Sequence, residues 1–297
     1  MLFLIYVNDM VEYLGKYGIL FMYADDTTII VSASTQEETI SKLETALSLF
    51  MKWCFYNKLK VNINKTACIG FSYGTRNPQT ISIQTDDGQI INLVEKATFL
   101  GTVIDSKLTF SDHIDLVCIK LKKLHYLFLN LTNYLDKNAL LSVYYAKVYS
   151  AFSYNIIVWG QSTEACRVFT LQKRVIRRIY NLKFNESCRD TFRNNRLLTF
   201  VSVYLLKILV YIHKHRLVLK RNRDNHEYST RSGDNLYLPK CHHSKFKKSV
   251  QYAGCYLYNV LSPDIKNITN TNTFKNVLKD LLIVKCCYTI QEYLNVI

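Results

Sequence analysis

The stretch ILFMYADDTTIIVS, residues 19–32, joins two β-rich runs through a pair of adjacent carboxylates. Its flanks, ILFMY and TTIIVS, are aliphatic, aromatic and β-branched, and such residues favour strands. Ala24, Asp25 and Asp26 separate the flanks, which predicts a β-hairpin with both carboxylates at its tip. Adjacent carboxylates repel each other, and a divalent cation relieves that repulsion. An Asp-Asp turn is also common as a solvated turn, so both interpretations stay open at this point.

A helix is expected directly after this hairpin, over residues 36–55. Ser34 and Thr35 are each followed three residues later by a glutamate, which is the capping-box pattern of a helix start. Apolar side chains then recur at the spacing of one helix face, at Ile40, Leu43, Leu47, Phe50 and Cys54. We therefore predict that this helix packs an apolar face on the hairpin.

The rest of the first third of the chain is expected to add short elements. Residues 2–7 are an apolar run that fits either a buried helix end or a strand. Strands are predicted at 59–63, 67–72 and 97–104, and the turn-rich segment 73–92 is predicted to hold a hairpin. Together with the first hairpin and its helix, these elements indicate an α+β fold.

Beyond residue 110 the spacing of apolar residues changes to that of helices. Steps of three and four from Ile114 to Leu131 predict a long helix after a Ser111 cap. Further helices are predicted at 138–157, 165–182, 198–215, 246–260 and 273–295, with a polar, irregular segment at 216–245. The fold class is therefore α+β followed by an all-α part.

The formal net charge of +15 over 297 residues is unevenly distributed. Residues 1–110 hold 9 Lys+Arg and 11 Asp+Glu, a net charge of −2, whereas residues 111–297 hold 29 and 12, a net charge of +17. Such a basic region favours nucleic acid as a partner, with a solvated basic surface as the plainer interpretation. No membrane span is expected, because the apolar stretch 200–212 contains Lys207 and falls short of the ~20 residues a span needs.

The helix predicted at 165–182 carries the clearest basic pattern. One face is apolar and holds Val168, Leu171, Val175, Ile179 and Leu182. We predict Lys173 and Arg177 opposite this face, with Arg174 and Arg178 on its flanks. Four outward cations suit contacts to phosphates, and a solvated helix face is the alternative.

The nine cysteines form no C-x-x-C pair, which disfavours a zinc ribbon or a redox motif. Cys241, His242, His243 and Cys255 come nearest to a metal cluster, but their spacing fits no standard zinc pattern. An odd number of cysteines without framework spacing indicates reduced thiols. We therefore expect an intracellular protein of the nucleus, the cytoplasm or both.

Several short stretches follow one another in a recognisable order. They are LFLIYVNDM (2–10), YADD (23–26), Trp53 with NKLKVN (57–62) and NKT (64–66), FLGTVID (99–105) with LTF (108–110) and HI (113–114), Tyr154 with Trp159-Gly160, and LQKRVIRRI (171–179). In this order they resemble the motifs of reverse transcriptases from non-LTR, LINE-like retrotransposons of the jockey type. The resemblance covers residues 1–180 and is looser over the last hundred residues.

This resemblance implies a partial polymerase palm with its primer grip at 1–110, a helical thumb and connection at 111–215, and a basic helical C-terminal region at 216–297. It also implies RNA-directed DNA synthesis, with an RNA template, a DNA primer and deoxynucleotide triphosphates as partners. The family's first palm carboxylate lies upstream of the segment at which this chain begins, so the chain is expected to be a C-terminal fragment with little or no activity alone. The alternative is a non-catalytic remnant of a retroelement that binds RNA or DNA.

The resemblance further assigns roles to single residues. Asp25 and Asp26 are the implied ligands of Mg²⁺, or of Mn²⁺ in its place, in two-metal nucleotidyl transfer. Tyr23 is expected near the incoming nucleotide, Lys65 near its phosphates, and Gly101 where the primer backbone approaches closely. A solvated strand-end lysine and an ordinary strand bulge are the alternatives for the last two.

Two further assignments follow from the same resemblance. The four basic residues of the 165–182 helix, Lys173, Arg174, Arg177 and Arg178, are implied contacts to the template–primer backbone. Asp9 is implied to end a structural helix instead of serving as a third metal ligand.

Overall fold

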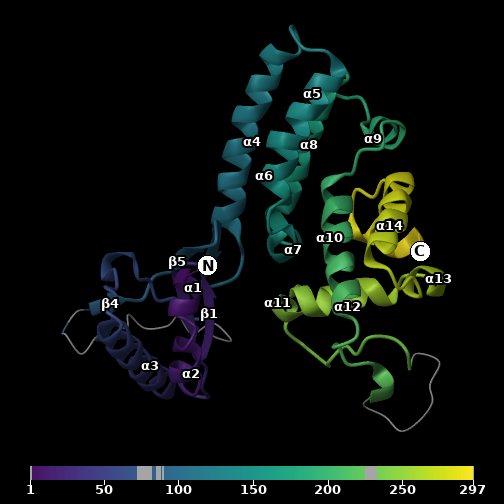
Figure 1. Cartoon of the computed structure of the whole chain (residues 1–297). Helices are drawn as coiled ribbons and strands as arrows, with labels where there is room; N and C mark the ends of the chain where they lie inside the picture. The colour runs from purple at the N-terminus through teal and green to yellow at the C-terminus, as the bar shows by residue number, and fades with distance from the viewer. Residues whose placement is uncertain (1, 72–81, 85–87, 89, 225–232, 297) are drawn as a thin grey trace. The chain divides into compact units, whose positions relative to one another are not determined.

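The computed structural model describes residues 2–71, 82–84, 88, 90–224 and 233–296 (Figure 1). The chain divides into two compact units. The N-terminal unit comprises Met1–Phe99 and Asp105–Lys107, and the C-terminal unit comprises Leu100–Ile104 and Leu108–Ile297. The first mixes helices with small antiparallel sheets and the second is mainly helical, so the predicted α+β class agrees with the structure.

The N-terminal unit contains three helices, a 3₁₀ turn and five strands among its described residues. They are α1 (Leu2–Tyr6), α2 (Met10–Leu14), β1 (Ile19–Tyr23), β2 (Asp26–Ile30), α3 (Gln36–Tyr56), η1 (Ile63–Lys65), β3 (Ser82–Gln84), β4 (Ile90–Asn92) and β5 (Lys96–Phe99). β1 pairs with β2, and β3 with β4, in two separate antiparallel sheets. β5 pairs with β6 (Thr102–Asp105), and the division between the two units runs through this hairpin.

The predicted acidic hairpin is confirmed. β1 and β2 pair from Ile19 opposite Ile30 to Tyr23 opposite Asp26. Ala24 and Asp25 form the two-residue turn, and Ala24 takes a left-handed φ of 53°. Asp26 is therefore the first residue of β2, and Asp25 alone of the two carboxylates belongs to the turn.

The predicted packing of the hairpin on the following helix is also confirmed. Side chains alternate between the faces of a strand, so Leu20 and Met22 share the face of β1 opposite to Tyr23. They pack on a small core whose buried members are Val7, Met10, Leu14, Trp53 and Cys54. Trp53 and Cys54 belong to α3, so the hairpin and the helix meet in this cluster.

The start of α3 has the predicted capping box. The Thr35 hydroxyl accepts a hydrogen bond from the Glu38 backbone N–H at 3.2 Å. The Glu38 carboxylate pairs with Lys42 and accepts from the Ser34 and Thr35 backbone, and these contacts lower the pKa of Glu38. Both partners of the motif therefore act at the helix start, as the sequence pattern requires.

Four predictions for the N-terminal unit need correction. The run at 2–7 is a helix, and α1 is exposed along its length, with the buried residue Val7 following it. The strand predicted at 59–63 is wrong: the chain there leads into the 3₁₀ turn η1, and the 67–72 prediction reduces to a single bridge from Cys68 to Leu93 among the described residues. The strand predicted at 97–104 is wrong as one element, because the chain reverses at Leu100 and Gly101, giving β5 and β6.

The hairpin predicted within 73–92 is confirmed where the structure describes it. Ser82–Gln84 pairs with Ile90–Asn92, with Ile83 opposite Ile91. Ile83 and Ile91 are buried together with Leu47 of α3 in a second small cluster. Residues 72–81 of the predicted strand and hairpin lie outside the described residues.

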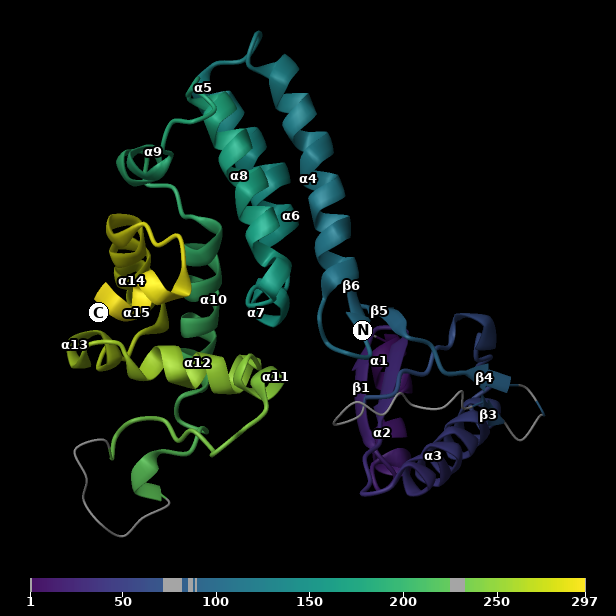
Figure 2. The ribbon, with the colours of Figure 1, turned by 180° about the vertical axis from the view of Figure 1, so that it is seen from behind.

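The C-terminal unit is helical after β6. Its elements are α4 (Ser111–Leu131), α5 (Lys137–Val143), the π-helical η2 (Tyr144–Tyr149), α6 (Ser150–Ser153), α7 (Ile156–Trp159), η3 (Thr163–Ala165), α8 (Cys166–Ile179), α9 (Arg189–Asn194), α10 (Phe200–His215), η4 (Asn222–Asp224), α11 (Ser244–Lys247), α12 (Val250–Asn259), α13 (Pro263–Lys266), α14 (Thr271–Lys285) and α15 (Ile290–Val296). α4 and α8 run side by side, as Figures 1 and 2 agree. One continuous hydrophobic core joins α4 to the C-terminal helices.

Several helix boundaries in this unit differ from the predictions. Ser111 is the first residue of α4 and does not cap it; its hydroxyl donates to Glu164 at 3.0 Å. The helix predicted at 138–157 changes to π geometry at Tyr144 and breaks at Tyr154. The helix predicted at 273–295 is two helices, because Cys286 takes a left-handed φ of 49° after α14.

Among the described residues, no helix combines the length and the apolar character that a transmembrane span requires.

Candidate active site and nucleic-acid interface

The acidic tip of the first hairpin presents its carboxylates to solvent. Asp25 and Asp26 are exposed, and neither has a hydrogen bond or an ion pair within the described residues. Directly opposed residues of an antiparallel pair point to the same face, so Asp26 lies beside Tyr23, which is 66% exposed. The tip therefore offers oxygen ligands and an adjacent phenol on one open edge.

Within the part of the chain that the structure describes, the tip brings together two carboxylates. Among residues 2–71, 82–84, 88, 90–224 and 233–296, no group of three or more His, Cys, Asp or Glu side chains lies close enough to hold a metal ion. Asp9, a possible third ligand by residue type, precedes α2 at its N-terminal end. Mg²⁺ accepts one or two carboxylates and completes its shell with water and substrate phosphates, so the pair suits that ion in chemical type.

Lys65 lies apart from any contact with this pair. It ends the 3₁₀ turn η1 and its side chain is exposed. The interpretation of Lys65 as a strand-end lysine is wrong, because residues 57–62, which lead directly into η1, form no strand. Within the described residues it makes no hydrogen bond or ion pair with Asp25 or Asp26.

Gly101 occupies the tight turn between β5 and β6. Its φ is +75° and that of Leu100 is +45°, so the chain reverses through two left-handed residues. Glycine adopts this conformation without strain. Because Gly101 lies in the turn between β5 and β6 and not within a strand, the strand-bulge interpretation is wrong. A Cβ at this position would lie 3.6 Å from the Tyr154 ring, so the side chain of Tyr154 closes one side of the turn.

The segment between α6 and α7 holds that turn in place. The Tyr154 hydroxyl donates to the Leu100 carbonyl at 2.6 Å, and the Asn155 amide donates to the Thr102 hydroxyl at 2.9 Å. The Trp159 indole N–H in turn donates to the Tyr154 carbonyl at 3.0 Å. Tyr154 and Trp159 stood out in the sequence only as parts of a motif. The bonds that Tyr154 and Asn155 make to the turn each join residues more than fifty apart in the chain.

His113 of α4 also fastens this hairpin. The Val103 N–H donates to its Nδ1 at 3.4 Å, and the His113 ring meets Trp159 edge to face at 5.4 Å. Burial lowers the pKa of His113, which favours the neutral ring that can accept such a bond. The turn at Gly101 is therefore supported from both α4 and the α6–α7 segment.

The basic residues of α8 are arranged differently from the prediction. Arg174 and Arg178 are exposed, whereas Lys173 and Arg177 are half-buried. The Lys173 ammonium lies over the rings of Phe169 and Tyr288, at 4.7 and 5.4 Å from their centroids. The prediction that all four cations point into solvent is thus wrong for Lys173 and Arg177, and Arg174 and Arg178 are the two that are exposed.

The cause is that later parts of the chain cover one side of α8. Arg177 donates from Nε and a terminal nitrogen to the Glu186 carbonyl, at 3.3 and 3.0 Å. Tyr288, which follows α14, covers Lys173. Helical spacing alone does not reveal such a cover, because it comes from residues distant in sequence.

His125 of α4 joins the exposed arginines. Burial lowers its pKa first, and the nearby positive charges of Arg178 and Arg174 lower it further. The packing of α4 on α8 therefore gathers His125, Arg174 and Arg178 into one group, here called the α4–α8 basic seam. His125 was not among the predicted site residues, because its only signal in the sequence is its place one turn after Leu121 on the predicted helix.

Comparison with known proteins identifies the class: the chain is similar to RNA-directed DNA polymerases of jockey-type, non-LTR retrotransposons. It is 30% identical over 170 residues to the probable RNA-directed DNA polymerase from transposon BS of Drosophila melanogaster, covering 55% of this chain and 18% of that protein. It is 25% identical over 178 residues to the polymerase from mobile element jockey of the same species, covering 58% and 19%.

A further relative is the probable RNA-directed DNA polymerase from transposon X-element of Drosophila melanogaster, 24% identical over 188 residues, or 60% of this chain and 20% of that protein. The resemblance drawn from the motifs is thereby confirmed. The chain spans about one fifth of the length of these curated relatives. No protein-family model and no solved structure matches the chain.

Proposed function

We propose that this chain is part of an RNA-directed DNA polymerase of a non-LTR retrotransposon and carries two of its catalytic carboxylates. The observation that carries the proposal is the hairpin that holds Asp25 and Asp26 exposed and unpaired beside Tyr23. The relatives named above are RNA-directed DNA polymerases, which supports this assignment. The N-terminal unit would then be part of the palm, and α4 to α8 would belong to the thumb.

Asp25 and Asp26 would hold Mg²⁺, or Mn²⁺ in its place. The ion would supply charge stabilisation at the primer hydroxyl and at the departing pyrophosphate. Asp25 sits in the turn and Asp26 opens β2, so their backbone positions are set by the pairing of the hairpin. Tyr23 shares the face of Asp26, which supports its proposed place beside an incoming deoxynucleotide triphosphate.

Gly101 and Lys65 take supporting roles in this proposal. The β5–β6 turn has no side chain at Gly101, so a primer backbone would approach it closely on the side that Tyr154 does not close. Tyr154 and Asn155 position that turn through the bonds described above. Lys65, exposed at the end of η1, provides a cation for nucleotide phosphates.

The RNA template and the DNA primer would contact the C-terminal unit chiefly at Arg174 and Arg178. Lys173 and Arg177 are drawn into contacts with the protein and contribute less. Contacts of this kind go to phosphates and carry little sequence information. A protein with these partners works inside the cell, in the nucleus, the cytoplasm or both.

We further propose that the chain by itself does not polymerise. Electrostatic stabilisation of the reacting groups is a large part of catalysis, and the described residues bring no third carboxylate to Asp25 and Asp26. The same observation favours a second candidate function, a retroelement remnant that binds RNA or DNA without chemistry. The basic C-terminal region suits that function as well.

A metal-binding measurement tests the role of the tip. Titration of the purified chain with Mn²⁺, followed by electron paramagnetic resonance, should show binding that the pair Asp25→Asn, Asp26→Asn abolishes. Glu12→Gln with Glu44→Gln is the control, since it removes two separate carboxylates from the same unit. Equal Mn²⁺ binding by the tip variant and the parent would refute the proposed site.

A further inference from the structure

Two aromatic side chains stand in solvent at the end of α3. Phe55 is 79% exposed and Tyr56 is 75% exposed, and their rings meet edge to face at 5.9 Å between centroids. Trp53 and Cys54 of the same turn fill the small core of the N-terminal unit. The two exposed rings therefore add nothing to that core, and exposed aromatic clusters mark surfaces that bind a partner.

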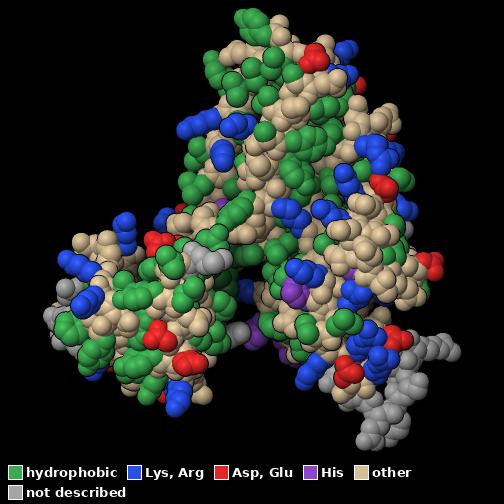
Figure 3. Space-filling view, viewed as in Figure 1, with side chains coloured by type: hydrophobic (Ala, Val, Ile, Leu, Met, Phe, Trp, Pro, Cys, Tyr) green, Lys and Arg blue, Asp and Glu red, His purple; other side chains and the backbone are tan. Residues whose placement is uncertain are grey.

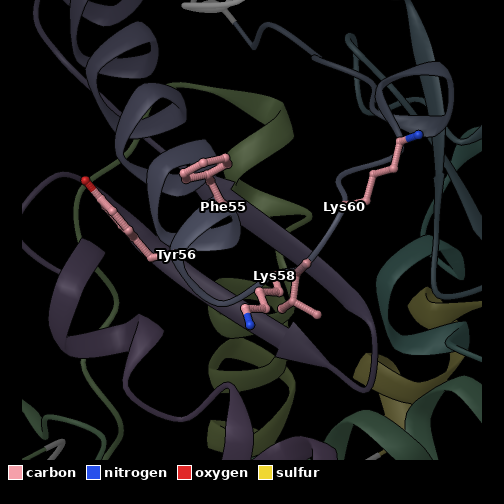
Figure 4. A pocket seen from close by; sticks show the side chains of 5 residues that line it. Phe55, Tyr56, Lys58 and Lys60 are labelled. Atoms are coloured by element: carbon pink, nitrogen blue, oxygen red, sulfur yellow. The ribbon is translucent and has the colours of Figure 1, made fainter.

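The chain beyond the helix makes a shallow hollow beside these rings. Lys58, Leu59 and Lys60 line it together with the two aromatics, and its volume is about 610 Å³. Figure 4 shows Phe55 and Tyr56 projecting from the last turn of α3, with Lys58 and Lys60 on the segment that follows. We call these five residues the Phe55–Lys60 platform.

Local hydrogen bonds keep the backbone of the platform in one conformation. The Asn57 amide donates to the Trp53 carbonyl at 2.9 Å, and the Tyr6 hydroxyl donates to the Asn57 carbonyl. Lys58 takes a left-handed φ of 53°, after which the Leu59 N–H returns to the Cys54 carbonyl at 2.8 Å. A surface held in this way loses little conformational freedom when a ligand binds.

The charged residues that neighbour the platform in the sequence are all basic. Residues 45–71 include Lys52, Lys58, Lys60 and Lys65 and contain no Asp or Glu, although residues 1–110 as a whole carry a net charge of −2. Four of the nine Lys and Arg residues of 1–110 thus fall in this short segment, and two of them, Lys58 and Lys60, line the hollow beside Phe55 and Tyr56. A polyanion with flat apolar groups complements such a surface, and this description fits unpaired nucleotides.

We propose that the Phe55–Lys60 platform binds single-stranded RNA or DNA, with bases stacked on Phe55 and Tyr56 and phosphates beside Lys58 and Lys60. Every base has a π-face, and stacking does not read base edges, so binding is expected to be tolerant of sequence. The open hollow suits a passing strand better than an enclosed small molecule. This site is separate from the α4–α8 basic seam and goes beyond the role proposed for it.

A tryptophan placed in the platform reports on stacking directly. Trp53 and Trp159 are 3% and 0% exposed, so Phe55→Trp introduces an indole whose surroundings differ from both. Titration of this variant with a 15-nucleotide oligothymidylate should quench the added fluorescence as bases stack on the ring. Phe184→Trp, at another exposed aromatic position, is the control and should be quenched far less.

Affinity measurements on the full-length chain complete the test. Phe55→Ala with Tyr56→Ala should weaken binding of labelled oligothymidylate by about 5- to 150-fold for each base unstacked. Tyr134→Ala with Phe184→Ala, two exposed aromatics of the C-terminal unit, should leave that affinity within about twofold. Lys58→Gln with Lys60→Gln should reduce the log–log salt slope by roughly 1.4.

The possible outcomes distinguish single-strand binding by the platform from the proposed metal site at Asp25 and Asp26. Loss of single-strand binding with unchanged RNA–DNA duplex binding in the Phe55, Tyr56 variant supports the platform. Unchanged single-strand affinity in that variant overturns it, as does an equal loss in the Tyr134, Phe184 control. Neither of these overturning results bears on metal binding at Asp25 and Asp26, which is measured without nucleic acid.

Discussion

The two units of this protein bury their apolar side chains to very different degrees. The N-terminal unit has two small clusters, one around Trp53 and one around Ile83, and leaves α1 and the outer face of β1 exposed. The C-terminal unit has one continuous core in which Phe128, Trp159 and many others are fully buried. Figure 3 shows apolar side chains, in green, exposed on the surface of the N-terminal unit.

The residues proposed for catalysis and the larger hydrophobic core therefore belong to different units. The carboxylates proposed for catalysis lie on the thinly packed unit, whereas the basic seam lies on the well-packed one. Stability grows with the apolar area removed from water, so the C-terminal unit has the larger share of the folding free energy. Nucleic-acid binding by that unit is therefore expected to persist when the acidic tip is altered.

The largest effect is expected in the C-terminal core. Trp159→Ala removes a fully buried ring that packs near Phe200 and bonds to the Tyr154 carbonyl, and should cost about 3–5 kcal/mol of unfolding free energy. Urea unfolding followed by far-ultraviolet circular dichroism measures this loss. Phe55→Ala, at an exposed ring of the other unit, should cost no more than about 0.5 kcal/mol. Equal losses would break the comparison between the units.

The α4–α8 basic seam should show the next effect, in salt dependence. Arg174→Gln with Arg178→Gln should lower the log–log salt slope for an RNA–DNA duplex by about 1.4–1.8, the share of two phosphate contacts. Lys173→Gln with Arg177→Gln should lower it less, because these side chains already contact Tyr288 and the Glu186 carbonyl. Fluorescence anisotropy at several salt concentrations measures both slopes. If Lys173→Gln with Arg177→Gln lowered the slope as much as Arg174→Gln with Arg178→Gln, the greater exposure of the two arginines would not matter for binding.

A smaller effect is expected from pH, at a buried histidine of the C-terminal core. His213 stacks on Phe274 with 3.7 Å between centroids and bonds to the Tyr258 hydroxyl at 3.0 Å. Burial, and then the charge of Arg216, lower the pKa of His213 to about 4. The unfolded chain, with a histidine pKa of about 6.5, binds the proton first, so this stability is present above that pH and is lost as pH falls towards 4.

Unfolding by urea at pH 7 and at pH 5 tests this direction. The parent should be less stable at pH 5, and His213→Leu should remove part of that difference, since no proton can bind there. His242→Gln, at an exposed histidine, serves as the control and should keep the parent's dependence. A parent more stable at pH 5 than at pH 7 would contradict the sign.

The smallest effect is expected at the acidic tip. Asp25→Ala with Asp26→Ala should change the unfolding free energy by no more than about 0.5 kcal/mol, because both side chains are exposed and unpaired. Extension of a primed RNA template by the parent should equal that of this variant, since no third carboxylate accompanies the pair among the described residues. Mg²⁺-dependent extension that the substitutions abolish would show that this chain is catalytic by itself.

Local patterns predicted the elements that local forces control. The hairpin at 19–32, the capping box at Thr35 and Glu38, and the apolar face of α8 all follow from spacing within a few residues. Short apolar runs were less informative, because the same residues suit a strand, an exposed helix or an irregular segment. The runs at 59–63 and 97–104 failed for this reason: one leads into a 3₁₀ turn and the other reverses at Gly101.

The sequence by itself determined the order of the motifs, the acidic tip and the basic balance of the C-terminal region, since these depend on residue type and spacing alone. Only the tertiary structure decided which cations remain free. Lys173 contacts the Tyr288 ring and Arg177 donates to the Glu186 carbonyl, whereas Arg174 and Arg178 lie near His125. It likewise decided that Tyr154 and His113 support the turn at Gly101. Contacts between residues far apart in the chain leave no periodic signal, because they arise only when the helices pack.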